Sequence, residues 1–361
     1  MEVSQYIDQK KEIQSHLLNF IDSEEKFDSE YEQLINFLNS INIQSNDKEF
    51  LMFLYLISRV SSNHHRSNNF FTKIEKVISY FEKEIKQFFT KSQIFDIFRC
   101  NKRILLFLLE NNYLELDSEL QNLLGSYYQK DDQVELNLFK ENQKIGENES
   151  VLCQYIRKDL AEDFISYVQR SMTSLKSEVK HSNFETNPLL IKNKVTLIEY
   201  AAFYGSITIF NYLRLNNVPL KPSLWLFAIH SNNAELIHLL EEYNVGLPGN
   251  SFLLCLKEAI KCHHNEIANY FLNNKIMESE AFLNFKDNII AYCYHYHNYE
   301  FFPTIFDYQY TAVYLCKYNY YKLVELFLDN KEFDFNSKIS LIDDKKEILI
   351  YFFFNKNEIL I

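Results

Sequence analysis

Glycine and proline are scarce in this chain, with five residues of each among 361. Average proteins devote roughly 12% of their residues to these two types. An all-β sandwich needs many tight turns that are rich in both, and a Rossmann or Walker-type phosphate loop needs clustered glycines. The sequence contains no such cluster, and both folds are disfavoured. The scarcity therefore predicts an all-α protein.

The charge balance argues against a nucleic-acid partner. The chain carries 37 basic and 49 acidic residues, a formal net charge of −12, whereas phosphate binding demands a basic surplus. The longest apolar runs, 104–109 and 348–354, are far shorter than the roughly 20 residues of a membrane span. The N-terminus lacks the apolar stretch of a signal peptide. Six cysteines without a C-x-x-C pattern indicate reduced thiols. We expect a cytoplasmic protein without membrane insertion.

Residues 1–150 are predicted to form an N-terminal helical region. Ile74, Val77 and Ile78 begin an apolar series with the three-and-four spacing of an amphipathic helix. The nearly continuous apolar run 50–60 predicts a buried helix, and the polar segment 140–150 predicts a linker. This region is interpreted either as degenerate repeats or as the polar-faced cap that a solenoid requires.

The most informative feature is internal self-similarity between residues 188 and 336. Segments 196–218, 223–245 and 254–276 align by eye, a fourth copy starts at Thr311, and 292–306 forms a degenerate copy. A period near 30 residues is the signature of a solenoid built from helix pairs. The residues that align in one small-residue slot are Ala201, Ala228, Ala259, Cys293 and Cys316.

The repeated pattern resembles the ankyrin repeat. The residues that match its consensus in the first copy are Thr196, Ala201, Ala202, Gly205, Ile209 and Leu213. Residues 151–276 also resemble the ankyrin-related domain of unknown function found in protist ankyrin-repeat proteins. Consensus proline and histidine are absent from every copy, so the resemblance supports the helix pairs more than the β-turn fingers between them. It implies an ankyrin-like α-solenoid over 151–336, followed by 337–361 as a capping helix, a docking tail or the end of a truncated array.

Local chemistry supports this register. Thr196 and Glu199 have the spacing of a capping box, in which the hydroxyl accepts from the third helical N–H and the carboxylate reaches back. The small-residue slots are expected where two helices press together, because large side chains would overpack there. Trp225 is expected in the core.

We predict no metal site, no cofactor and no catalytic residues. Several cysteines and histidines are of the residue types that bind zinc. We expect that they do not converge on one ion, because adjacent histidines point apart and stacked helices lie about 8–10 Å apart. No nucleophile elbow or acid–base motif is present either. The cysteines and histidines considered and set aside are Cys255, Cys262, His263, His264, Cys293, His295 and His297.

The function expected is non-catalytic binding of an unknown protein partner on the concave face of the helix-pair stack, with no small-molecule substrate. The ankyrin resemblance implies that binding residues lie just before the glycine slot; their alternative role is to fill space between repeats. An adaptor that delivers partners to a modification machinery, such as ubiquitin transfer, is the alternative function. The predicted partner-binding residues are Phe203, Tyr204, His230, Ser231, Lys261, Tyr318 and Asn319.

Overall fold

The computed structural model describes residues 2–127, 136–276, 282–302 and 314–329, and the short stretches 339–343, 346–350, 353–355 and 358–360. Side chains beyond residue 326 are not described. The chain divides into two compact units. Unit 1 comprises Met1–Leu56 and Ala281–Ile361, and unit 2 comprises Ile57–Glu280. The predicted helical class is confirmed, since helices form most of the described residues.

The helices of unit 2 follow one another with short connections. They are α4 (Phe70–Tyr80), α5 (Glu82–Phe88), α6 (Lys91–Phe98), α7 (Lys102–Glu110), α8 (Ser118–Leu124), α9 (Leu136–Ile145), α10 (Val151–Arg157), α11 (Ala161–Ser171), α12 (Pro188–Lys192), α13 (Leu197–Tyr204), α14 (Ile207–Leu215), α15 (Leu224–His230), α16 (Ala234–Glu242), α17 (Phe252–Cys262) and α18 (Asn265–Phe271), with the short turns η2 (Gly125–Tyr127), η3 (Pro248–Asn250) and η4 (Leu272–Ile276). The predicted linker 140–150 is thus helical as far as Ile145.

Unit 1 combines the first helices of the chain with its last elements. Its elements are α1 (Val3–Asp22), α2 (Phe27–Ser40), η1 (Ile43–Ser45), the first part of α3 (Asp47–Asn63), α19 (Phe282–Tyr296), η5 (Tyr299–Phe301), α21 (Tyr321–Asp329), β1 (Ile339–Asp343), β2 (Lys346–Ile350), β3 (Phe353–Asn355) and β4 (Glu358–Leu360). Within the described residues, no helix is both long enough and apolar enough to cross a bilayer.

The division into units differs from the predicted boundary at residue 150. α1 contacts η5 and α21, and polar groups of Gln14 explain why. The Gln14 amide nitrogen donates to Asn298 Oδ1 at 3.2 Å, and its oxygen accepts from the Tyr299 backbone N–H at 2.8 Å. Gln14 and Asn298 are buried, so each needs such a partner. The N-terminal helices therefore pack with the last part of the chain.

The C-terminal segment also differs from the predicted capping helix. β1 pairs antiparallel with β2, and β3 pairs antiparallel with β4. The segment is rich in isoleucine and phenylalanine, which favour extended backbone. Short apolar runs of this kind fit a strand or a buried helix equally well by periodicity alone. The alternative role as a docking tail depends on side chains outside the described residues.

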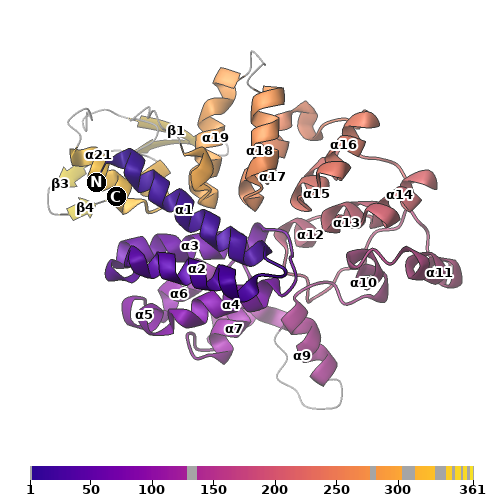
Figure 1. Cartoon of the computed structure of the whole chain (residues 1–361), viewed down its shortest axis with the longest axis horizontal. Coiled ribbons are helices and arrows are strands. Elements are labelled where there is room, and N and C mark those ends of the chain that lie inside the picture. Colours follow the sequence, from indigo (N-terminus) through magenta and orange to yellow (C-terminus); the bar gives the residue numbers. More distant parts are fainter. Residues whose placement is uncertain are drawn as a thin grey trace. The chain divides into compact units, whose positions relative to one another are not determined.

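In unit 2, consecutive helices pack as pairs. α10 contacts α11, α13 contacts α14, α15 contacts α16, and α17 contacts α18. The first helices of these pairs also touch in sequence, from α10 through α13 and α15 to α17 (Figure 1). The apolar faces expected on the second helices are buried, since Ile209, Leu213, Leu236 and Leu240 are at most 1% exposed. Trp225 is buried as expected, and its indole N–H donates to the Val245 carbonyl at 3.0 Å.

One backbone turn recurs at the ends of several first helices. In this turn, the N–H of one residue donates to the carbonyl five residues earlier. The residue directly before the donor has left-handed backbone and ends the helix, as in a Schellman motif. The five left-handed residues are Asp159, Gly205, His263, His297 and Asn319. Their N–H to carbonyl pairs are Leu160 to Tyr155 (3.0 Å), Ser206 to Ala201 (2.9 Å), His264 to Ala259 (3.0 Å), Asn298 to Cys293 (3.0 Å) and Tyr320 to Leu315 (2.8 Å).

The position of this turn shows that the fourth copy is aligned one residue earlier than predicted. Its expected start at Thr311 lies outside the described residues. Leu315, and not Cys316, is the counterpart of Ala201, because its carbonyl accepts the closing N–H. Asn319 therefore lies in the glycine slot itself, with φ of 63°, instead of just before it. Asparagine tolerates left-handed backbone far better than a tyrosine would. The next residue, Tyr320, is buried.

The predicted capping box at α13 is present in modified form. Glu199 reaches back to accept from the Thr196 backbone N–H at 2.8 Å. The Thr196 hydroxyl, however, donates to the same carboxylate at 2.7 Å. Glu199 also accepts from the Ser223 hydroxyl at 2.5 Å. Since Ser223 precedes α15, the buried carboxylate links the starts of two neighbouring first helices.

The small-residue slots lie where these helices meet. Ala201, Ala228 and Ala259 are completely buried, and their helices α13, α15 and α17 are in contact. We expect Ala201→Leu to lower the free energy of unfolding by about 1–3 kcal/mol, because the added atoms must displace packed neighbours. Urea denaturation measures the change. An exposed position on the same unit, Ala234→Leu at the start of α16, serves as the control, and equal stabilities of the two variants would contradict the packing.

Candidate functional site

The predicted partner-binding residues fall in both units. Phe203, Tyr204, His230, Ser231 and Lys261 lie near the ends of α13, α15 and α17 in unit 2. Tyr318 and Asn319 lie in unit 1, where Asn319 donates to the Tyr55 hydroxyl at 3.4 Å and accepts from Tyr321. The structure therefore brings together the first five residues within one unit and places the last two in the other.

Phe203 and His230 pack against each other. Their rings stack with centroids 3.9 Å apart at an interplanar angle of 15°. Phe203 is 2% and His230 is 1% exposed. The imidazole Nε2 contacts the Asn187 side-chain nitrogen at 2.9 Å, and burial together with nearby His264 lowers the His230 pKa well below its usual value. For these two residues, the geometry favours the space-filling role over direct contact with a partner.

The remaining predicted residues of unit 2 are partly exposed. Ser231 follows α15 and donates its hydroxyl to the Ala228 carbonyl at 2.7 Å. Lys261 pairs with Glu258 on the same helix at 2.7 Å. Tyr204 is partly exposed although its hydroxyl oxygen is buried, and burial together with Glu147 raises its pKa well above the usual value. These three residues are the part of the predicted row that reaches the surface.

A polar network that the sequence did not reveal lies beneath Tyr204. The Arg157 guanidinium pairs with Glu147 at 2.9 Å, and both side chains are largely buried. It also donates to the Asn148 carbonyl at 2.6 Å and to the Tyr200 hydroxyl at 3.2 Å. Burial raises the Glu147 pKa, and Arg157 opposes this rise. The loop before α10 is thereby fastened to α13.

A cavity of about 370 Å³ opens beside this network. Glu185 lines it, is 7% exposed, and accepts from the backbone N–H groups of Thr186 and Asn187 at 2.9 Å through Oε1. Its other oxygen, Oε2, accepts no hydrogen bond from the described residues. Burial raises the Glu185 pKa to about 7. The lysines that line the cavity are Lys180, Lys192 and Lys194.

The cysteines and histidines that were considered and set aside in the sequence are divided between the two units. Cys293, His295 and His297 belong to unit 1, whereas the other four belong to unit 2. Cys255 and Cys262 are buried, and burial raises the pKa of both thiols, that of Cys255 to about 12. His264 lies beside His64 and His65, which follow α3 and were not among the residues considered in the sequence.

Three comparisons with known proteins identify no relative. No family model, no curated protein and no solved structure matches the chain. The resemblance to ankyrin repeats therefore rests on the residues of the chain alone.

Proposed function

We propose that the chain is a degenerate ankyrin-like repeat protein that binds a partner protein without catalysing a reaction. The helix pairs α10–α11, α13–α14, α15–α16 and α17–α18 are interpreted as successive repeats of a solenoid. The observation that carries this proposal is the set of four consecutive helix pairs whose first helices touch in sequence. Three of these first helices, α10, α13 and α17, also end in the same left-handed turn, at Asp159, Gly205 and His263. Solenoids of helix pairs present extended binding surfaces along such stacked helices.

The surface offered to the partner is the row at the ends of the first helices. Its partly exposed residues are Tyr204, Ser231 and Lys261, while Phe203 and His230 support it from below. A mixture of aromatic, hydroxyl and cationic groups suits a protein interface. The buried thiols, none of which is in a disulfide among the described residues, support a cytoplasmic location.

Two serines provide a matched test of this surface. We expect Ser231→Arg to weaken partner binding by at least about tenfold, because a long cation would stand where the partner approaches. Ser171 ends α11 and also donates to a carbonyl of its own helix, so Ser171→Arg makes the same local change away from the row. Proximity labelling with the full chain identifies partners, and calorimetry measures both variants against the strongest one. Equal affinities for the two variants would move the site elsewhere.

The alternative function, an adaptor for a modification machinery, predicts a particular set of partners. Ligase subunits would then copurify with the full chain at stoichiometric levels and would be retained by Ser231→Arg if they bind another surface. Partners without any ligase subunit favour the simple scaffold.

A further inference from the structure

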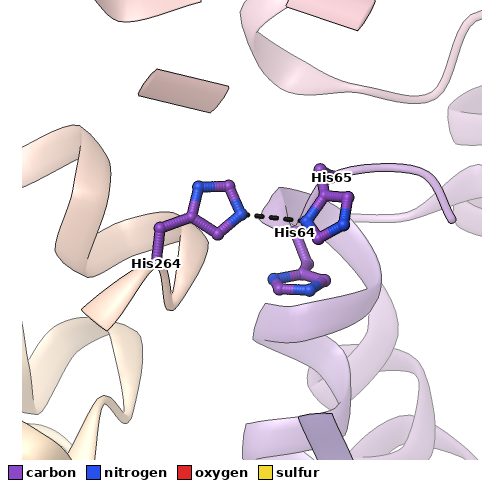
Figure 2. A group of neighbouring side chains, drawn as sticks. All are labelled: His64, His65 and His264. Carbon is purple, nitrogen blue, oxygen red and sulfur yellow. Dashed lines mark hydrogen bonds between the residues drawn. The ribbon is translucent and has the colours of Figure 1, made fainter. Parts of the chain in front are cut away.

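Three histidines from distant parts of the sequence meet inside unit 2 (Figure 2). His64 and His65 directly follow α3, and His264 follows the left-handed turn at the end of α17. Each offers one ring nitrogen, and these three atoms all lie within 4.8 Å of one another. His65 Nδ1 and His264 Nε2 lie 3.0 Å apart and form a hydrogen bond (Figure 2). His64 and His264 are buried, and His65 is partly exposed.

Backbone carbonyls fix the orientation of two of the rings. His64 Nδ1 lies 2.6 Å from the Cys262 carbonyl, and His264 Nδ1 lies 2.8 Å from the Ile229 carbonyl. A carbonyl only accepts hydrogen bonds, so Nδ1 carries the proton in both rings. In the neutral ring, the lone pair then belongs to Nε2. Metal-binding histidines commonly use this arrangement, in which the second ring nitrogen donates to a carbonyl or carboxylate and orients the ligand.

We propose that His64, His65 and His264 form a Zn²⁺ site. Zinc takes imidazole nitrogens at about 2.0–2.1 Å in tetrahedral geometry, which places ligand nitrogens about 3.3–3.4 Å apart. The observed separations, 3.0 Å between His65 and His264 and at most 4.8 Å within the group, bracket this spacing. Three protein ligands leave a fourth position for water. The bound ion would tie the segment after α3 to the turn between α17 and α18, across 199 residues of sequence, and would stabilise the folded chain by mass action.

Asparagine variants separate ligation from packing. The side-chain nitrogen of asparagine lies close to the position of Nδ1, so His64→Asn and His264→Asn keep the bonds to the two carbonyls and remove the Nε2 ligands. His65→Ala removes the partly exposed ligand. Exposed His181 and His238 provide the controls His181→Ala and His238→Ala.

The experiment titrates the metal-free full chain with Zn²⁺ by calorimetry and with Co²⁺ by visible absorption. We expect one equivalent of either ion, a tetrahedral Co²⁺ spectrum, and a higher melting temperature with Zn²⁺. Each of the three ligand variants should bind at least about tenfold more weakly and lose the melting shift, while both controls behave like the parent chain. Circular dichroism without metal verifies that each variant is folded.

Two results would overturn the proposal. One is the absence of stoichiometric binding by the parent chain, which would leave the cluster as a hydrogen-bonded contact between its two elements. The other is binding that survives in all folded ligand variants or disappears in His181→Ala or His238→Ala, which would assign the ion to surface histidines. Neither result bears on partner binding at the row containing Ser231.

Discussion

Replacing Arg157 by methionine is expected to lower the free energy of unfolding by about 3–5 kcal/mol. The substitution removes the guanidinium that pairs with Glu147 at 2.9 Å, and these side chains are only 13% and 15% exposed. The carboxyl group would keep the cost of burial and lose the charge that offsets it. The bonds to the Asn148 carbonyl and the Tyr200 hydroxyl would also disappear. Urea denaturation at pH 7 measures the loss.

An exposed ion pair provides the control for Arg157→Met. Lys91 pairs with Glu115 at the surface, where the side chains are 55% and 78% exposed. Lys91→Met should cost less than about 1 kcal/mol, because solvent screens that pair. Adding Glu147→Gln to Arg157→Met should recover part of the stability, since the orphaned charge is then gone. A loss below about 1 kcal/mol for Arg157→Met would show that the network contributes little.

Local patterns in the sequence predict the helices well. Ile74, Val77 and Ile78, with which the apolar series begins, are buried in α4, because a three-and-four spacing places these residues on one helix face. The alanine slots are also predictable, because only small residues fit where two helices touch. The break between α4 and α5, next to Phe81, carries no glycine or proline signal.

Long-range pairings escape this kind of prediction. Gln14 meets Asn298, and His64 meets the Cys262 carbonyl, across 284 and 198 residues. Periodicity describes which face of a helix is apolar but not which distant segment covers it. The same limit applies to the prediction of the candidate site. Phe203 and His230 occupy the expected positions in the repeat, yet they stack on each other because α13 and α15 are adjacent.

The fourth copy shows how small errors of register arise. Alignment by residue type places Cys316 in the small slot, because cysteine resembles alanine in size. The backbone instead closes its turn from Leu315, with Asn319 in the left-handed position. A preference for asparagine at left-handed positions would have identified the correct register, since Asn217, Asn232 and Asn244 adopt the same conformation elsewhere.

Glu185 should make the stability of the folded chain fall as the pH rises from about 4.5 to about 7. Its folded-state pKa of about 7 lies above the usual value of 4.5, because the buried carboxyl is costly to ionise. In this window the folded chain holds a proton that the unfolded chain has released. The favourable contribution is therefore complete below pH 4.5 and lost as the pH passes 7. A difference of 2.5 pKa units corresponds to about 3 kcal/mol.

The substitution Glu185→Gln isolates this effect, since the introduced amide keeps an oxygen for the N–H groups of Thr186 and Asn187 but cannot ionise. We expect the variant to gain about 3 kcal/mol relative to the parent chain between pH 4.5 and pH 8, with most of the change below pH 7. Urea denaturation at several pH values measures the difference between the two curves, which cancels the contribution of other buried carboxyls such as Glu147. Glu178 lines the same cavity but is exposed, so Glu178→Gln should leave the curve parallel to that of the parent chain. If Glu185→Gln also gives a parallel curve, the carboxyl ionises without cost, and the cavity must then supply water or a cation to its second oxygen.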